Sequence, residues 1–257
     1  MLANSPQGPV EVPEAVLALA GREPAEAVWQ NEAGGLTFRV GERFVKWTPA
    51  GSGLDLAAEA VRLRWARAFA VVPRVLEQGA DTAGQWLVTA ALPGGMAVLD
   101  EWKRDPATAV RAIGRGLREL HEALPVGECP FDWSVPSRLA RVRTASGPED
   151  WHPDHRHLGS AERALALLAE APPVDRLVVC HGDACAPNTL IGADGRCAGH
   201  VDFGALGLAD RWADLAVATW STQWNYGPGW ELPLLEAYGV EPDPERTAYY
   251  RLLWDLT

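Results

Sequence analysis

The chain has 257 residues, of which 47% are hydrophobic and 22% charged, values typical of a globular protein with a substantial core. It contains no run of about 18 apolar residues, so a membrane-spanning helix is not expected and a membrane is not a predicted partner. The formal net charge of −11 also makes nucleic acid a poor partner, because phosphate binding requires clustered Lys and Arg.

The negative charge is unevenly distributed along the chain. Residues 1–92 hold 10 acidic and 8 basic side chains, whereas residues 93–257 hold 24 and 15. An acidic surface by itself keeps a protein soluble. The same excess also suits a polycationic small molecule, which would find an acidic substrate cleft in the second region.

The four cysteines and the first residues bear on the compartment. The cysteines form no C-x-x-C pair, so neither a zinc ribbon nor thioredoxin chemistry is indicated, and we expect reduced thiols. The chain begins MLANSPQGPVEVPEAV, without a basic start followed by an apolar core, so no secretory signal is visible. We therefore expect a cytoplasmic protein.

The first third of the chain is predicted to form a small antiparallel sheet. A short helix is expected at residues 13–20, and strands are expected at residues 27–30, 36–40, 43–48, 73–76 and 85–91. A helical stretch at residues 54–70 separates the third strand from the fourth. The sequence Leu-Pro-Gly-Gly at residues 92–95 then marks a break, and we divide the chain into domains 1–92 and 93–257.

One lysine in the predicted sheet is a candidate phosphate ligand. The chain has only two lysines, Lys46 and Lys103, against 21 arginines. Lys46 lies in the third strand, and a compact ammonium can contact two phosphates where a planar guanidinium would not fit. The alternative for Lys46 is a solvated side chain on an edge strand.

The second region is mainly helical. Apolar residues with helical spacing predict helices at residues 106–124 and 161–170, and a polar stretch at residues 145–159 lies between them. A further helix is expected to open near residue 209. Short strands at residues 177–180, 189–191 and 199–203 surround a polar loop, and a turn at residues 192–195 joins the last two.

Three oxygen-bearing side chains in and after that polar loop predict phosphoryl transfer. Asp183 can orient an attacking hydroxyl or accept its proton, while Asn188 and Asp202 can converge on Mg²⁺ bound to nucleotide phosphates. Phosphoryl transfer depends mainly on positioning and charge neutralisation, so these three groups are most of what the protein must supply. The alternative is an unrelated hairpin with stray acidic residues.

The same stretch resembles a known motif. His181-Gly182-Asp183, then Asn188, then Asp202-Phe203-Gly204 match the kinase pattern H-x-D-x-x-x-x-N followed by D-F-G. The strings HGDACAPN and GHVDFGALGLADRWADLA resemble the aminoglycoside phosphotransferases, the 3′-type in particular, which share the protein-kinase fold. The resemblance covers nearly all of the chain from about residue 27 and implies an α+β, two-lobed protein-kinase-like fold, with an N-terminal antiparallel sheet plus helix and a mainly helical C-terminal lobe.

The resemblance also implies roles in nucleotide binding. In this family a strand lysine pairs with a helix glutamate and grips the phosphates of ATP or GTP, which assigns those roles to Lys46 and Glu59. Residues 89–92 would line the adenine site, so Thr89 and Ala91 are nucleotide candidates. Asp214 would steady the catalytic loop by hydrogen bonding, although an acid in the first turn of a helix also has a helix-dipole explanation.

Candidates for binding a cationic aminoglycoside come from three segments. The family presents acids from an insert between helices, from the residues after the D-F-G segment, and from the C-terminus. The corresponding residues here are Asp150, Asp154, Asp210, Arg211, Asp255 and Thr257. Many members end D-E-F-F, whereas this chain ends W-D-L-T and keeps one acid, which puts in doubt which drug binds and whether the 3′ hydroxyl is preferred.

The resulting prediction is ATP- or GTP-dependent, Mg²⁺-assisted phosphorylation of an aminoglycoside hydroxyl, with the 3′ group favoured, which would confer antibiotic resistance. One alternative is a kinase of streptomycin at its 3″ hydroxyl, of a macrolide or of another small alcohol. An alternative of another class is a catalytically silent kinase-like binding protein.

Overall fold

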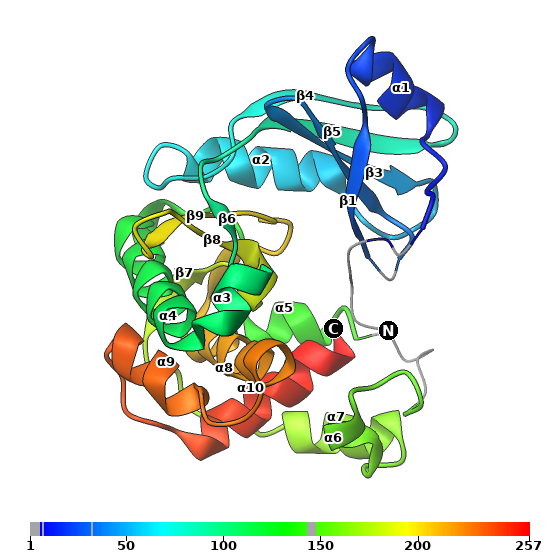
Figure 1. Cartoon of the computed structure of the whole chain (residues 1–257). Coiled ribbons are helices and arrows are strands. Elements are labelled where there is room, and N and C mark those ends of the chain that lie inside the picture. The colour runs from blue at the N-terminus through cyan, green and yellow to red at the C-terminus, as the bar shows by residue number, and fades with distance from the viewer. Residues whose placement is uncertain (1–5, 7, 32, 143–147) are drawn as a thin grey trace. The chain divides into compact units, whose positions relative to one another are not determined.

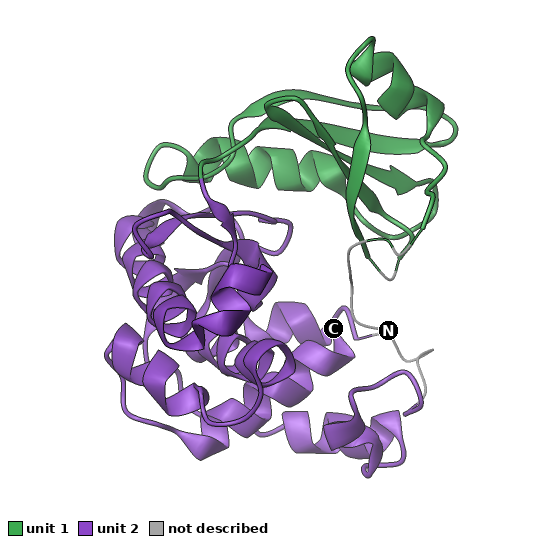
Figure 2. Ribbon diagram, viewed as in Figure 1, with its two compact units in different colours: residues 1–93 green, residues 94–257 purple. Residues whose placement is uncertain are grey.

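The computed structural model describes residues 6, 8–31, 33–142 and 148–257 (Figure 1). The chain divides into two compact units, Met1–Pro93 and Gly94–Thr257 (Figure 2). This division lies one residue from the boundary expected at residues 92 and 93. Gly94 has a φ of 94°, a backbone conformation open mainly to glycine, which accounts for the break in regular structure.

The first unit is an antiparallel sheet with two helices. Its elements are α1 (Glu14–Ala20), β1 (Glu26–Gln30), β2 (Leu36–Val40), β3 (Arg43–Pro49), α2 (Leu56–Ala66), β4 (Val75–Ala80) and β5 (Gly84–Ala90). The strands lie in the order β1-β2-β3-β5-β4, and every neighbouring pair is antiparallel.

Local sequence explains both kinds of element in this unit. Leu36, Phe38 and Val40 alternate along β2 and point into the core, as the two-residue period of a strand requires. Helix α2 begins where the side chain of Asp55 accepts a hydrogen bond from the backbone N–H of Ala58 at 2.8 Å. The buried face of α2 contacts β4 and β5, which fixes the helix against the sheet.

The second unit is mainly helical, with two small sheets. Its helices are α3 (Asp100–Arg104), α4 (Pro106–Ala123), η1 (Val126–Glu128), α5 (Val135–Leu139), α6 (Pro153–Arg156), α7 (Ala161–Leu168), η2 (Ala186–Asn188), α8 (Trp212–Tyr226), α9 (Glu231–Tyr238) and α10 (Pro244–Leu256). Its strands are β6 (Gly95–Met96), β7 (Leu177–Cys180), β8 (Thr189–Ile191), β9 (Cys197–His200) and β10 (Gly207–Asp210).

Helix α8 is the centre of the second unit. Every residue from Trp212 to Thr222 is buried, as expected for a helix covered on all sides. Helices α9 and α10 both contact α8, and α4 packs against α9. Strand β7 pairs with β10, while β8 pairs with β6 and β9.

Two expectations about these elements were wrong. The strand expected at residues 199–203 ends at His200, and Asp202 lies beyond it with a φ of 69°, which does not suit a strand. The helix expected from residue 209 begins at Trp212, because residues 207–210 pair with β7 instead. In the described part of the chain, no helix has the length and apolar character needed to span a bilayer.

Candidate active site

The loop of residues 181–188, here called the catalytic loop, begins where β7 ends. Strand β7 is held by antiparallel pairing with β10, in which Cys180 lies opposite Gly207. Gly182 has a φ of 90°, and a Cβ atom there would lie 2.2 Å from the carbonyl oxygen of Ala205. Only glycine fits this turn without displacing the backbone, which explains the residue between His181 and Asp183.

A buried carboxylate holds the first half of the catalytic loop. Asp214 Oδ2 accepts the backbone N–H of His181 at 2.6 Å, and Asp214 Oδ1 accepts that of Gly182 at 2.8 Å. Burial by itself raises the pKa of Asp214, but hydrogen bonding and charge from His121, with the N–H of Gly182, outweigh it and lower the pKa. The carboxylate is therefore a stable anion beneath the loop.

The second half of the catalytic loop is held by two further contacts. The backbone N–H of Ala186 donates to Ser221 Oγ on α8 at 2.9 Å. The backbone N–H of Asn188 donates to the carbonyl oxygen of Cys185 at 2.9 Å and closes the short turn η2. Residues from α8 therefore fix both ends of the loop.

The structure brings Asp183 and Asn188 into direct contact. Asn188 Nδ2 donates to the carbonyl oxygen of Asp183 at 2.9 Å and to its Oδ2 at 3.0 Å. Asp183 Oδ1 is buried and has no hydrogen-bond partner among the described residues. An orphaned carboxylate oxygen of this kind can accept a proton or a hydrogen bond from a substrate.

The segment carrying Asp202 is anchored through His181. His181 Nε2 donates to the carbonyl oxygen of Val201 at 2.9 Å, and the ring centroids of His181 and Phe203 lie 4.7 Å apart. Phe203 is fully buried. Asp202 is the one non-glycine residue with positive φ in the described part of the chain, and its unusual backbone is held between the anchored carbonyl of Val201 and the buried Phe203.

The charges of this site fit a hard cation. Burial raises the pKa of Asp183, and the nearby negative charge of Asp202 raises it further. The carboxylate oxygens of Asp183 and Asp202 and the amide oxygen of Asn188 are hard oxygen ligands, the type that Mg²⁺ prefers. The residues present therefore fit a magnesium ion bound beside Asp183.

Cys185 is not set up as a nucleophile. Burial raises the pKa of its thiol well above the usual range, and the charge of Asp183 acts in the same direction. The thiol therefore stays protonated near neutral pH, and a packing role fits its place in the loop.

The first unit contains the lysine pair expected from the sequence. Lys46 Nζ on β3 lies 2.7 Å from Glu59 Oε1 on α2, and the Glu59 side chain is only 6% exposed. A buried carboxylate fixes the ammonium in one position along the sheet. Thr89 lies in β5 opposite Phe44, and Ala91 donates its N–H to the carbonyl oxygen of Glu42 at 3.0 Å.

The candidate substrate residues divide into two groups. Asp150 and Asp154 are exposed, and the Asp154 side chain is 58% accessible. Asp210, Arg211, Asp255 and Thr257 all have partners within the unit. Asp210 accepts the backbone N–H groups of Asp175 and Trp212, and Arg211 pairs with Asp175 at 2.6 Å.

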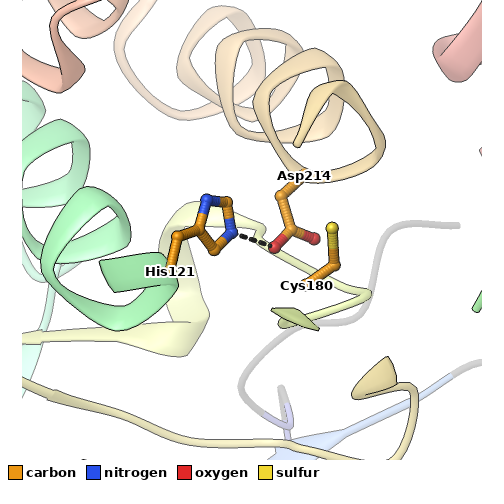
Figure 3. A group of neighbouring side chains, drawn as sticks. All are labelled: His121, Cys180 and Asp214. Atoms are coloured by element: carbon orange, nitrogen blue, oxygen red, sulfur yellow. Dashed lines mark hydrogen bonds and ion pairs between the residues drawn. The ribbon is translucent and has the colours of Figure 1, made fainter. Parts of the chain in front are cut away.

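His121, Cys180 and Asp214 cluster beneath the catalytic loop (Figure 3). Their ligand atoms lie within 4.8 Å of one another, a spacing that could hold a metal. Hydrogen bonds already engage these atoms: His121 bonds Asp214 and the Tyr238 hydroxyl, each at 2.9 Å, and the Cys180 thiol donates to the carbonyl oxygen of Asp210. The cluster is therefore a supporting network for the loop.

Sequence reasoning missed three members of this support, namely Ser221, Tyr238 and the role of His121. His121 follows a leucine at the end of an amphipathic helix, a pattern shared by many core histidines. No local signal pairs it with Asp214, 93 residues away. The contact depends on how α4 and α8 pack.

The site combines a loop aspartate with a buried oxygen, an asparagine five residues on and an aspartate after a hairpin. The first unit adds a strand lysine paired with a helix glutamate, and together these residues define a phosphotransferase of the kinase type. A model of the phosphotransferase enzyme family matches residues 6–250. The chain belongs to this family and, within it, to the aminoglycoside phosphotransferases.

Relatives of known name support that membership. An aminoglycoside 3′-phosphotransferase of Streptomyces fradiae is 40% identical over 219 residues, which cover 80% of this chain and 81% of the relative. A streptomycin 3″-kinase of Streptomyces griseus is 36% identical over 252 residues, covering 90% of this chain and 91% of the relative.

Solved structures agree with the α+β, kinase-like fold predicted from the sequence, which is confirmed. The crystal structure of an aminoglycoside-3′-phosphotransferase of type VIII aligns with a TM-score of 0.75 at 35% identity, covering 95% of this chain and 98% of that one. The aminoglycoside phosphotransferase APH(3″)-Id of Streptomyces rimosus, in complex with ADP and streptomycin, aligns with a TM-score of 0.73 at 30% identity, covering 94% and 95%.

Proposed function

We propose that this enzyme transfers the γ-phosphoryl group of ATP or GTP to a hydroxyl of an aminoglycoside antibiotic, with the 3′ hydroxyl favoured, and so confers resistance. The names of the relatives support the substrate class, and the related complex with ADP supports a nucleotide co-substrate. The site residues point to the same chemistry independently of those names.

The observation that carries the proposal is the contact between Asp183 and Asn188 in a loop fixed from below by Asp214. Asp183 presents an unpartnered buried oxygen, and Asn188 is held so that its amide nitrogen faces Asp183. This orientation reserves the amide oxygen of Asn188 for another ligand. A rigid pair of this kind suits transfer chemistry, which requires accurate positioning of the reacting atoms.

Asp183 serves as the proton acceptor in this mechanism. The substrate hydroxyl oxygen attacks the γ-phosphorus, the bond from that phosphorus to the bridging oxygen breaks, and the hydroxyl proton passes to Asp183. The raised pKa of Asp183 makes it a stronger base than an exposed carboxylate.

The proposed nucleotide ligands are the residues that the family motif assigns. Lys46, fixed by Glu59, binds the α- and β-phosphates, and Thr89 and Ala91 line the adenine site. Asn188 and Asp202 would hold Mg²⁺, which when bound neutralises the negative charge of the phosphates. The chain's own contribution is the fixed placement of these ligands.

The exposed acids Asp150 and Asp154 are the proposed contacts for the ammonium groups of the drug. Both belong to the segment of residues 148–160, here called the insert. Asp210, Arg211, Asp255 and Thr257 already have partners within the unit, so they are weaker candidates for direct contact.

Streptomycin phosphorylation at the 3″ hydroxyl is the second candidate. The match to the streptomycin 3″-kinase extends over 90% of this chain, compared with 80% for the S. fradiae 3′-phosphotransferase.

A panel of aminoglycosides with ATP and GTP tests the proposal, with the position of phosphorylation read by phosphorus NMR. We expect phosphorylated product from at least one drug, and loss of at least about a thousandfold in kcat for Asp183→Ala. Asp194→Ala, which removes an exposed acid from the nearby hairpin turn, is the matched control and should retain full activity. Unchanged turnover in Asp183→Ala, or no product from any drug, would refute the proposal.

A further inference from the structure

The C-terminal helix and the insert are joined by one carboxylate. Asp255 on α10 accepts the backbone N–H of His152 at 3.0 Å through Oδ1 and at 3.1 Å through Oδ2. Asp255 Oδ2 also lies 2.7 Å from His155 Nδ1. The side chains of Asp255 and His155 are only 9% and 14% exposed, so this contact is largely shielded from water.

Aromatic packing surrounds this junction. The ring centroids of His152 and Trp220 lie 4.3 Å apart, and those of His155 and Trp220 lie 5.2 Å apart. Trp254, next to Asp255, packs against Trp220 and Trp224. The insert therefore rests on α8 through rings, and the Asp255 carboxylate of α10 fixes its position.

The same packing orients an exposed carboxylate. Trp220 Nε1 donates to Asp154 Oδ2 at 3.1 Å, and His152 Nδ1 lies 3.5 Å from the same oxygen. No hydrogen bond to Asp154 Oδ1 occurs within the described residues, and the side chain is 58% exposed. Asp154 thus combines a fixed backbone, a fixed carboxylate plane and one oxygen facing solvent.

We propose that Asp255 and His155 form a clasp whose role is to position the insert, so that Asp255 acts on substrate affinity through Asp154 and does not itself contact the drug. This inference rests on the proposed function for its kinetic consequence. A carboxylate that is already held in place loses less conformational entropy when it binds a cation than a mobile carboxylate does. The clasp therefore determines affinity for the aminoglycoside and leaves the phosphoryl-transfer step unchanged.

Kinetics of the single and double variants test the clasp. His155→Ala and Asp255→Ala should each raise the KM for the aminoglycoside by about tenfold, with kcat and the KM for ATP within about twofold of the parent. Both changes break the contact between His155 and Asp255, and Asp255→Ala also removes the acceptor for the N–H of His152, so the double variant should be no worse than Asp255→Ala alone. His155→Asn, whose amide can donate from nearly the same place, should restore most of the affinity.

Two matched controls keep the comparison specific. His157→Ala removes an exposed histidine of the insert whose side chain, among the described residues, bonds to the carbonyl oxygen of Asp154 alone. Glu245→Ala removes an exposed acid from the first turn of α10. Both should leave the KM for the aminoglycoside unchanged.

Amide hydrogen exchange gives a readout that does not require activity. The backbone N–H groups of His152, His155 and Leu158 all bond within or beneath the insert. We expect them to exchange about tenfold faster in His155→Ala and Asp255→Ala, and at the parental rate in His157→Ala. If no aminoglycoside is phosphorylated, the proposed function fails while this measurement still decides whether the clasp exists.

The outcomes are distinct. Direct contact between Asp255 and the drug predicts a large KM effect for Asp255→Ala, none for His155→Ala, and unchanged exchange of the insert amides. Additive effects in the double variant, or parental KM values in both single variants, would also overturn the clasp.

Discussion

The catalytic loop and the insert are held by the same device at different depths. In each, a helix carboxylate accepts backbone N–H donation and pairs with one histidine. Asp214 on α8 accepts two N–H groups of the catalytic loop, and Asp255 on α10 accepts one N–H group of the insert. The Asp214 side chain is fully buried, whereas that of Asp255 is 9% exposed and supports a segment with exposed side chains.

The burial of each carboxylate determines how rigidly it holds the segment above it. A buried carboxylate with three donors cannot be replaced by water, so the loop above it has one conformation. A carboxylate nearer the surface can exchange its partners with water at lower cost, so loss of the Asp255 contacts should destabilise the chain less than loss of the Asp214 contacts. In the proposed function, the chemistry belongs to the deeper region and drug binding to the region nearer the surface.

Removing the deeper anchor should have the largest effect. In Asp214→Asn, the new NH₂ group faces at least one N–H donor and cannot accept its hydrogen bond. We therefore expect a loss of about 3 kcal/mol in unfolding free energy and at least a hundredfold lower kcat. Urea unfolding and steady-state kinetics measure both. The comparison fails if Asp214→Asn is no more destabilising than Asp255→Asn, which retains an accepting oxygen for the N–H of His152.

Glycine substitutions sharpen the contrast in backbone freedom. Gly182 and Gly159 both have positive φ, but an added Cβ meets the Ala205 carbonyl at 2.2 Å in the first and nothing within 4 Å in the second. We expect Gly182→Ala to cost about 3 kcal/mol and to lower kcat, and Gly159→Ala to cost about 1 kcal/mol. Thermal unfolding of both variants decides this, and equal losses would contradict it.

Acid should destabilise the region beneath the catalytic loop more than the insert. Burial, then the charge of His181, lowers the pKa of His200 from its ordinary 6.5 to about 3, so His200 stays neutral in the folded protein. The unfolded chain binds a proton below pH 6.5, and the stability that neutral His200 contributes above that pH is lost as pH falls towards 3.

The experiment compares His200→Gln with the parent. Between pH 8 and pH 5 the parent should lose about 2 kcal/mol more unfolding free energy than His200→Gln. His152 of the insert also has its pKa lowered, first by burial, but its side chain is 22% exposed. The extra loss of unfolding free energy in the parent, relative to His152→Gln, should therefore be smaller than the extra loss relative to His200→Gln. A larger loss would mean that the insert is more sensitive to acid than the region beneath the catalytic loop.

Much of the molecule followed from local patterns. Alternating apolar residues predicted strand β2, helical spacing predicted α4, and the motif at residues 181–204 located the catalytic loop. The Lys46–Glu59 contact was also expected, because a strand lysine followed 13 residues later by a helix glutamate is a family pattern. These features depend on spacing along the chain, which the sequence records directly.

Other features could not be read locally. Strand β10 was missed because its four residues pair with β7, which lies 30 residues earlier. Asp210 and Asp255 look alike in the sequence as acids near substrate segments, yet one accepts the backbone N–H groups of Asp175 and Trp212 and the other holds His152 and His155.

The amino-acid sequence by itself determined the chemical groups of the reaction and their order, because a motif is a set of residue types at fixed intervals. Only the tertiary structure decided which carboxylates are occupied. Whether an acid is available to a substrate depends on the donors that packing brings to it from distant segments, and those donors are set by how α4, α8, α10 and the insert pack together.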